Sequence, residues 1–195
     1  MKVQIEKVFA IPAPVDVSWR FLQDIAAVAA CMPGARITER LDDTHYKGTV
    51  SIKVGPASMS FRGDIEVREL DAATRTLRLI GKGSDTTGTS GASIDLTARV
   101  EAAEGGASNL VGKSEASVSG KAAAFGGRMM NSVADQVLKQ FAANFVAQVE
   151  LLKTPQAGAD PAASPPPAQG ELNGLALFWA ILKDWIRGLF SRQQG

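Results

Sequence analysis

The sequence predicts an α+β fold in which a seven-stranded antiparallel sheet wraps around one long C-terminal helix. Before residue 119, apolar side chains mostly alternate with polar ones, which is typical of strands with one buried face and one wet face. From Met130 onward apolar residues recur every three or four positions, the spacing of a helix with one apolar stripe. These residues are Val133, Val137, Phe141, Phe145, Val149 and Leu152. A helix over residues 120–153 would be roughly 48 Å long, enough to cross a small domain.

The strands are expected around residues 3–11, 37–41, 46–54, 59–67, 77–81, 94–100 and 110–118, with two short helices over 17–25 and 26–32. Prolines end the first strand, and Asp16 is placed to cap or charge the start of the first helix. Pro33-Gly34 ends the second helix, whereas Asp42-Asp43 and Gly55-Pro56 mark turns between strands. Short turns between successive strands imply antiparallel neighbours.

Small residues gather on the predicted inward face of the sheet. They are Gly48, Gly63, Gly81 and Gly112, together with Ala92, Ala98 and Ala116. An interface built only for stability would be filled with larger side chains, because protein interiors are close-packed. One interpretation is an internal apolar cavity that accepts a ligand. The other is that the glycines let a long sheet bend sharply around the helix, and the two are compatible.

Composition excludes several classes of function. The 195 residues are 45% hydrophobic and 21% charged with a net charge of +1, and without a Lys/Arg cluster nucleic acid is not an expected partner. Cys31 and His45 are the only residues of their kinds, so neither a disulfide nor a metal site is predicted. His45 is expected to be solvated and Cys31 to be packed. The N-terminus lacks the apolar core of a signal peptide, and no apolar run is long enough to span a membrane.

Several local patterns together resemble the CoxG family of carbon monoxide dehydrogenase subunits, a branch of the SRPBCC superfamily, over residues 1–153. They are Cys31-Met32-Pro33-Gly34, Tyr46-Lys47-Gly48, Val54-Gly55-Pro56, Phe61-Arg62-Gly63, residues 81–85, Gly88, Ala92 and residues 120–128. The resemblance implies the helix-grip fold of START and birch-allergen proteins, with an apolar pocket under the C-terminal helix. It also implies a non-catalytic partner of molybdenum CO dehydrogenase, or of a related molybdenum hydroxylase, at the cytoplasmic membrane. The same resemblance is consistent with binding of a quinone, either menaquinone or ubiquinone.

The candidate ligand-binding residues lie on the inward strand faces and on the helix stripe. They are Tyr46, Met59, Phe61, Gly63, Leu79, Gly81, Phe125, Met129, Met130, Val133, Val137 and Phe141. Methionine side chains adapt well to a flexible apolar ligand, although a stripe of this kind also forms ordinary core. The glycines of Phe125-Gly126-Gly127-Arg128 fit either close packing against a strand or a first helical turn that loosens to admit a ligand.

The C-terminal tail divides into two parts. Residues 154–170 are rich in Pro and Ala and predict a flexible linker. Residues 171–195 predict an amphipathic helix that lies on a membrane surface rather than spanning it, because Lys183, Asp184 and Arg187 interrupt its apolar stretch. Its candidate membrane-binding residues are Leu175, Phe178, Trp179, Leu182, Trp185, Ile186, Leu189 and Phe190. Docking of this helix on a partner protein or on its own domain is the alternative.

The residue patterns together with this resemblance imply a non-enzymatic accessory protein that binds a quinone in an apolar cavity and recruits a CO dehydrogenase to the inner face of the cytoplasmic membrane. A membrane adaptor without a ligand is one alternative. The other is an enzyme resembling the aromatases and cyclases of the superfamily, with Tyr46, Cys31 or an inward carboxylate as acid or base. The predicted inward faces are nearly free of the titratable groups that acid–base catalysis needs.

Overall fold

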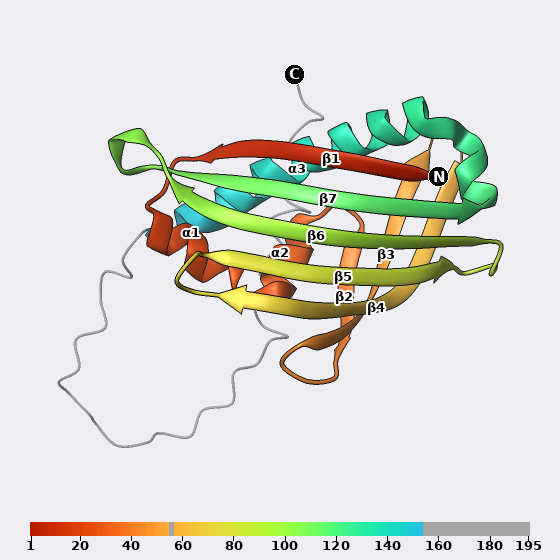
Figure 1. Cartoon of the computed structure of the whole chain (residues 1–195), viewed down its shortest axis with the longest axis horizontal. Coiled ribbons are helices and arrows are strands. Elements are labelled where there is room, and N and C mark those ends of the chain that lie inside the picture. The colour runs from red at the N-terminus through yellow and green to blue at the C-terminus, as the bar shows by residue number, and fades with distance from the viewer. Residues whose placement is uncertain (55–56, 154–195) are drawn as a thin grey trace, which may run out of the picture. The chain divides into compact units, whose positions relative to one another are not determined.

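The computed structural model describes residues 1–54 and 57–153 of the chain. Seven antiparallel strands form one sheet in the order β1-β7-β6-β5-β4-β3-β2, and Figure 1 shows the helices on one side of it. The strands are β1 (Lys2–Ile11), β2 (Ala35–Arg40), β3 (His45–Val54), β4 (Ala57–Asp71), β5 (Thr76–Asp85), β6 (Ser90–Ala102) and β7 (Ser108–Gly120). A short 3-10 turn, η1 (Glu104–Gly106), joins β6 to β7. The predicted fold class is confirmed.

Strand register confirms the predicted division into an inward and an outward face. Tyr46 of β3 lies opposite Ile65 of β4, and Ile65 lies opposite Gly81 of β5. Because side chains alternate along each strand, every second residue of these strands shares that inward face. The pairing slips once in β4, between Val67 and Glu69, where a bulge interrupts the ladder.

Two short helices, α1 (Val15–Leu22) and α2 (Ile25–Cys31), follow β1. The sequence placed Ile25 in the first helix, but it begins the second, because the Asp24 carboxylate accepts a hydrogen bond from the Ala27 amide (3.0 Å) and so starts a new helix. Asp16 lies in the first turn of α1, where its charge suits the helix dipole, and it makes no capping hydrogen bond there.

The long helix α3 (Gly126–Lys153) begins six residues later than the sequence predicted. A separate 3-10 turn, η2 (Lys121–Phe125), occupies the start of the predicted segment. Gly120 and Gly126 flank this turn with φ angles of 67° and 77°, values that a continuous α-helix does not allow. A Cβ atom on Gly120 would lie 2.0 Å from the Thr89 carbonyl oxygen, so only glycine fits there.

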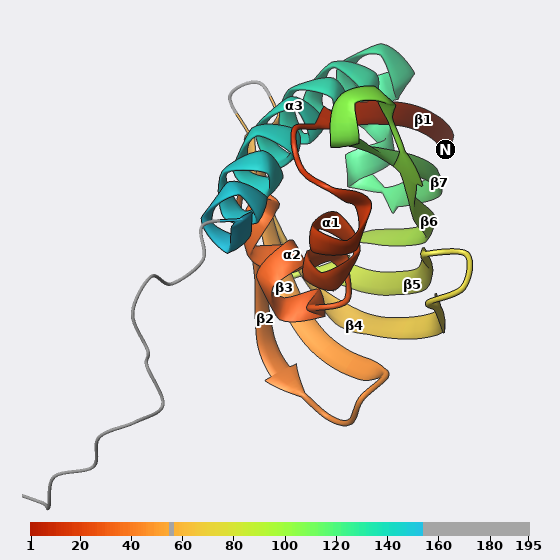
Figure 2. The ribbon, with the colours of Figure 1, turned by 90° about the vertical axis from the view of Figure 1, so that its left-hand side faces the viewer.

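The hydrophobic core gathers at one end of the sheet, where α1, α2 and the C-terminal half of α3 pack together (Figure 2). Phe145 of α3 is completely buried, and its ring lies 4.9 Å from that of Phe21, edge to face. The buried Ser108 hydroxyl donates to the Ala13 carbonyl (2.9 Å) and accepts from the Ser18 hydroxyl (2.8 Å), which satisfies both side chains. None of the described helices is long and apolar enough to cross a membrane.

Candidate ligand-binding cavity

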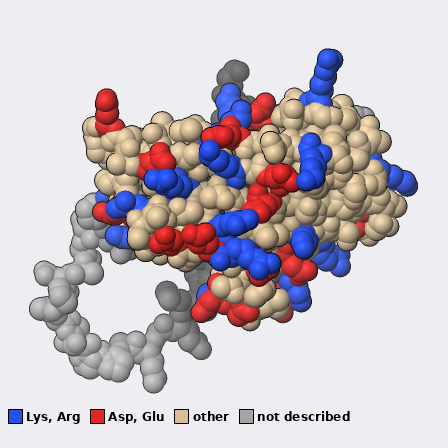
Figure 3. Space-filling model, in the orientation of Figure 1, with Lys and Arg blue, Asp and Glu red and all other residues tan. Residues whose placement is uncertain are grey.

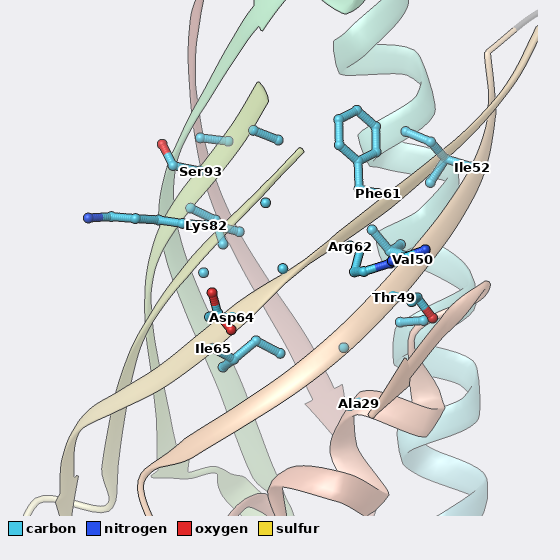
Figure 4. A pocket seen from close by; sticks show the side chains of 18 of the residues that line it. Ala29, Thr49, Val50, Ile52, Phe61, Arg62, Asp64, Ile65, Lys82 and Ser93 are labelled. Atoms are coloured by element: carbon cyan, nitrogen blue, oxygen red, sulfur yellow. The ribbon is translucent and has the colours of Figure 1, made fainter. Parts of the chain in front are cut away.

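The other end of the sheet is hollow. A cavity of about 330 Å³, partly open to solvent, lies between strands β2–β7 and the first half of α3. Its volume falls at the lower end of the range for small-molecule sites, about 300–1,000 Å³. Apolar side chains from four elements form much of its wall: Ala29 of α2, Ile37 of β2, Val50 and Ile52 of β3, and Met59 and Phe61 of β4. Figure 4 shows Phe61 and Ile52 beside the helix.

The hollow end results from the uneven distribution of side-chain size along α3 and the sheet. In the second half of α3, Phe145 and Val149 are fully buried, whereas no residue between 126 and 140 is. Opposite that first half, the inward positions of β6 and β7 carry the small side chains of Ala92 and Ala116. The side chains of the first half of α3 do not reach those of β6 and β7, so a space remains between the helix and the sheet. Ile94 is 36% exposed although it lies on the inward face.

The inward glycines serve two different purposes. Gly63 lies opposite Gly83, and a Cβ atom on Gly63 would come within 2.1 Å of the Lys82 carbonyl oxygen. Glycine is required there because β4 and β5 approach each other closely, as the bending interpretation predicted. A Cβ atom on Gly112 would meet nothing within 4 Å, but Gly112 does not line the cavity. Gly48, Gly63 and Gly81 do line it, so inward glycines border a cavity as well as allow close approach of the strands.

The cavity presents hydrocarbon and main chain to its interior. Four charged residues contribute to its wall: Arg36, Arg62, Asp64 and Lys82. All four are exposed, and they alternate with the inward residues, so their side chains belong to the outer face of the sheet. Figure 4 shows Lys82 extending away from Phe61 and Ile52. Among the described residues, no ionisable side chain of the wall is directed inward, and the wall is suited to an apolar group.

Five of the twelve predicted ligand-binding residues line this cavity: Met59, Phe61, Gly63, Gly81 and Met130. They come from β4, β5 and the N-terminal part of α3, three segments that the fold brings together. The sequence analysis did not select the contributions of α2 and β2. No periodic signal could have found Ala29, because its position under the sheet depends on how α2 packs. Ile37 belongs to β2, an edge strand of the sheet, and its inward position follows from pairing with Gly48. The alternation of apolar and polar residues did predict which residues of β3, β6 and β7 face inward.

The remaining seven predicted residues lie outside the cavity wall. Tyr46 and Leu79 lie toward the filled end, with Tyr46 in the core, where its hydroxyl donates to the Asp43 carbonyl (3.2 Å). Phe141 packs edge to face against Phe9, with ring centroids 6.4 Å apart. The other four belong to η2 and α3 but do not reach the cavity: Phe125, Met129, Val133 and Val137. Strand parity and helical spacing identify a face, and the face is longer than the cavity. The predicted membrane-binding residues of 171–195 lie outside the described residues.

The two residues considered for other chemistry are placed as expected. Cys31 is buried, and burial raises the pKa of its thiol, so it is not an activated nucleophile. The His45 side chain is exposed, and its ring contacts the Asp42 carboxylate at 2.9 Å. The Thr44 amide and the His45 ring hold the pKa of Asp42 well below its usual range. In the described part of the chain, no group of three potential metal ligands occurs.

The fold and the cavity define a class of protein in which a curved sheet grips a long helix around a space for an apolar ligand. Residues 8–150 match the CoxG family, which is described as a subunit of carbon monoxide dehydrogenase. The match covers well over half of the chain, and the chain belongs to this family, as the sequence motifs implied. No curated protein matches the sequence.

Solved structures with the same fold are similar at low sequence identity. A conserved protein from Geobacillus kaustophilus has a TM-score of 0.68 at 19% identity, over 76% of this chain and 96% of its own. The Zhui aromatase/cyclase from Streptomyces sp. R1128 has a TM-score of 0.59 at 14% identity, over 82% and 100%. A START superfamily protein from Mycobacterium smegmatis has a TM-score of 0.56 at 16% identity, over 77% and 99%. These likenesses establish the helix-grip fold.

Proposed function

We propose that this protein is a non-enzymatic accessory protein that carries a lipophilic quinone between the cytoplasmic membrane and a molybdenum CO dehydrogenase. The observation that carries the proposal is the cavity, which is open, apolar and free of inward ionisable side chains among the described residues. Membership of the CoxG family supports the choice of enzyme, with a related molybdenum hydroxylase as the alternative partner. Menaquinone and ubiquinone are the candidate ligands.

The size of the cavity limits how a quinone would be held. A space of about 330 Å³ accommodates one end of such a molecule, and the rest of a long isoprenoid chain would extend through the opening. The wall offers little to hydrogen-bond a quinone carbonyl, so the isoprenoid chain is the better occupant and the ring would stay near the opening. Each buried methylene contributes about 0.8 kcal/mol, so affinity arises without polar contacts.

Membrane attachment is assigned to residues 171–195, whose sequence combines two tryptophans and an apolar face with Lys183 and Arg187. The preceding segment, 154–170, has the composition of a flexible linker. In this proposal the linker lets the cavity domain exchange quinone with the bilayer while it remains close to the dehydrogenase. The protein would thereby connect CO oxidation to the respiratory chain.

A coupled assay tests this function. Purified CO dehydrogenase, CO and vesicles that contain menaquinone are mixed with the full chain, with a chain that lacks residues 154–195, or with neither. We expect menaquinone reduction to depend on the full chain and to be slow with the truncated one. Equal rates in all three mixtures would reject the carrier role.

The fold is also that of an aromatase/cyclase, but nothing seen in residues 1–54 and 57–153 favours an enzyme. An acid–base mechanism requires an ionisable group within hydrogen-bond reach of the reacting atom. Tyr46, the candidate acid, lies in the core with its hydroxyl bonded to the main chain.

A further inference from the structure

The outer face of the sheet is electrically balanced over β1, β7, β6 and the adjoining end of β5. Basic and acidic side chains pair across neighbouring strands: Lys2 with Glu115 (2.8 Å), Lys113 with Glu6 (2.9 Å) and Arg78 with Asp95 (2.8 Å). Figure 3 shows blue and red side chains intermingled over the face formed by these strands. This half of the face has little net charge to attract a charged partner.

The other half of the outer face is not balanced throughout. Behind the cavity, its outward residues on β2–β5 carry five cations against two anions: Arg36, Lys47, Lys53, Arg62 and Lys82 against Glu39 and Asp64. We name these five basic residues the cationic face. Within the described part of the chain, only Lys47 of this set has an ion pair, with Glu39 at 3.0 Å. Beyond the cavity, toward the filled end of β4, Glu66 pairs with Arg68 (3.0 Å) and Glu69 lies opposite Arg78, so charge is balanced there.

Strand register places these cations close together. Arg36 lies opposite Thr49, and Thr49 lies opposite Arg62, so the two arginines are two strands apart, about 10 Å. On the next outward row, Asp64 lies between Lys47 and Lys82. The outward positions between the cations carry hydroxyl side chains, at Thr49, Ser51, Ser60 and Ser84. The result is a surface of positive charge and hydrogen-bond donors without apolar side chains.

We propose that the cationic face is a docking surface for the anionic headgroups of a lipid bilayer. Protein interfaces have apolar or aromatic centres depleted in charge, and this surface has neither feature. Nucleic-acid binding on a sheet uses aromatic side chains for stacking, which are also absent from these described positions. An anionic headgroup layer requires only positive charge and hydrogen-bond donors, and each Lys or Arg near it contributes about 1 kcal/mol.

The position of this surface relates it to the cavity. Arg36, Arg62 and Lys82 border the cavity, while alternation directs their side chains outward, so the cationic face and the cavity are the two sides of the same strands. Docking would hold the cavity one sheet thickness from the headgroups. The inference rests on the proposed function and deepens it, because it assigns the face of the domain that would lie toward the bilayer.

The test is sedimentation of the full chain with vesicles of phosphatidylcholine alone and of phosphatidylcholine mixed with phosphatidylglycerol. The variant Arg36→Gln/Arg62→Gln/Lys82→Gln removes three charges of the cationic face. Each basic residue near an anionic membrane surface raises the partition coefficient of a protein about fivefold. We therefore expect binding of this variant to the mixed vesicles to fall about 10–100-fold. Binding to phosphatidylcholine alone should not change.

The matched control is Lys2→Gln/Arg78→Gln/Lys113→Gln, which removes the same charge from the balanced half of the same face. We expect it to lose less than about threefold, because exposed paired charges contribute little. Equal losses in the two triple variants would show that only net charge matters and would overturn the proposal. Unchanged binding of the first variant, or an equal loss on both kinds of vesicle, would also overturn it.

A quinone-binding measurement on the wild-type protein separates this proposal from the proposed function. If the wild type binds no menaquinone but the vesicle results are as expected, the carrier function fails and the docking surface remains. If the first variant still binds mixed vesicles but no longer binds the dehydrogenase, the face contacts a protein and the lipid proposal is wrong.

Discussion

Substitution of Ala116 by Phe tests whether the cavity is the ligand site. Ala116 lies in the cavity wall on the inward face of β7, opposite Ile94. A cavity that holds a benzene ring measures about 150 Å³, so a phenyl group there would occupy nearly half of the 330 Å³. Because it fills existing space, the change should leave the folded protein as stable as the wild type or slightly more so.

The expected loss of affinity follows from the hydrocarbon that the ring displaces. If one isoprenoid unit no longer fits, about five carbons lose their burial, at about 0.8 kcal/mol each. That gives an upper limit of about 4 kcal/mol, or about 1,000-fold in dissociation constant. Since a flexible chain can partly rearrange, we expect a loss of about 10–1,000-fold for a short-chain menaquinone in equilibrium dialysis.

The neighbouring residue supplies the control. Ser117 also borders the cavity, but alternation along β7 directs its side chain to the outer face of the sheet, so Ser117→Phe places the same ring on the side away from the cavity. We expect Ser117→Phe to bind menaquinone as the wild type does. If Ala116→Phe is folded by circular dichroism and binds menaquinone with unchanged affinity, the ligand does not occupy this cavity and the reasoning is refuted.

Other predictions concern the filled end of the fold, the surface and the tail. In a urea titration, Phe145→Ala should lower the free energy of unfolding by about 3–5 kcal/mol, because Phe145 is fully buried. Val133→Ala, on the half of α3 that covers the hollow end, should lower it by less than about 1.5 kcal/mol. Asp42 has a lowered pKa in the folded protein, caused chiefly by the Thr44 amide and then by the His45 ring. Its stabilising contribution is therefore present above the unfolded pKa of about 3.9 and is lost as the pH falls below that value. Asp42→Asn should show a shallower loss of stability on acidification than the wild type, and parallel curves would contradict this. Deletion of residues 154–195 should abolish sedimentation with vesicles of phosphatidylcholine alone, which offer the cationic face no anionic headgroup, and retained binding there would contradict the assignment of membrane attachment to this tail.

The strands were predictable because a half-buried sheet imposes a two-residue alternation on its sequence. The segment from Met59 to Val67 alternates without interruption, and the structure places its residues on the faces that this pattern indicates. The start of α3 was not predictable from spacing, because the regular apolar periodicity begins only at Met130, inside the helix. Gly120 and Gly126, both with positive φ angles, set that boundary, and Gly120 lies against Thr89 and Ser90, which are distant in the sequence.

The site was predictable only in part, for a similar reason. Alternation identified Met59 and Phe61 as inward residues, and both line the cavity. It also identified Tyr46 as an inward residue, but Tyr46 lies in the core and not in the cavity wall. The inward face of the sheet extends over both the filled and the hollow ends. Which end a residue occupies depends on where the bulky side chains of α1 and α3 meet, as Phe21 and Phe145 do. Ala29 reaches the cavity through helix packing, which leaves no periodic signal.

The most direct test of the central claim is native mass spectrometry of the full-length protein purified from membranes that contain quinone, with the extracted lipids identified in parallel. We expect one menaquinone or ubiquinone bound per chain and its loss in Ala116→Phe. A protein that is empty in this measurement, yet sediments with vesicles, would contradict the carrier function and leave a membrane adaptor whose cavity holds no quinone.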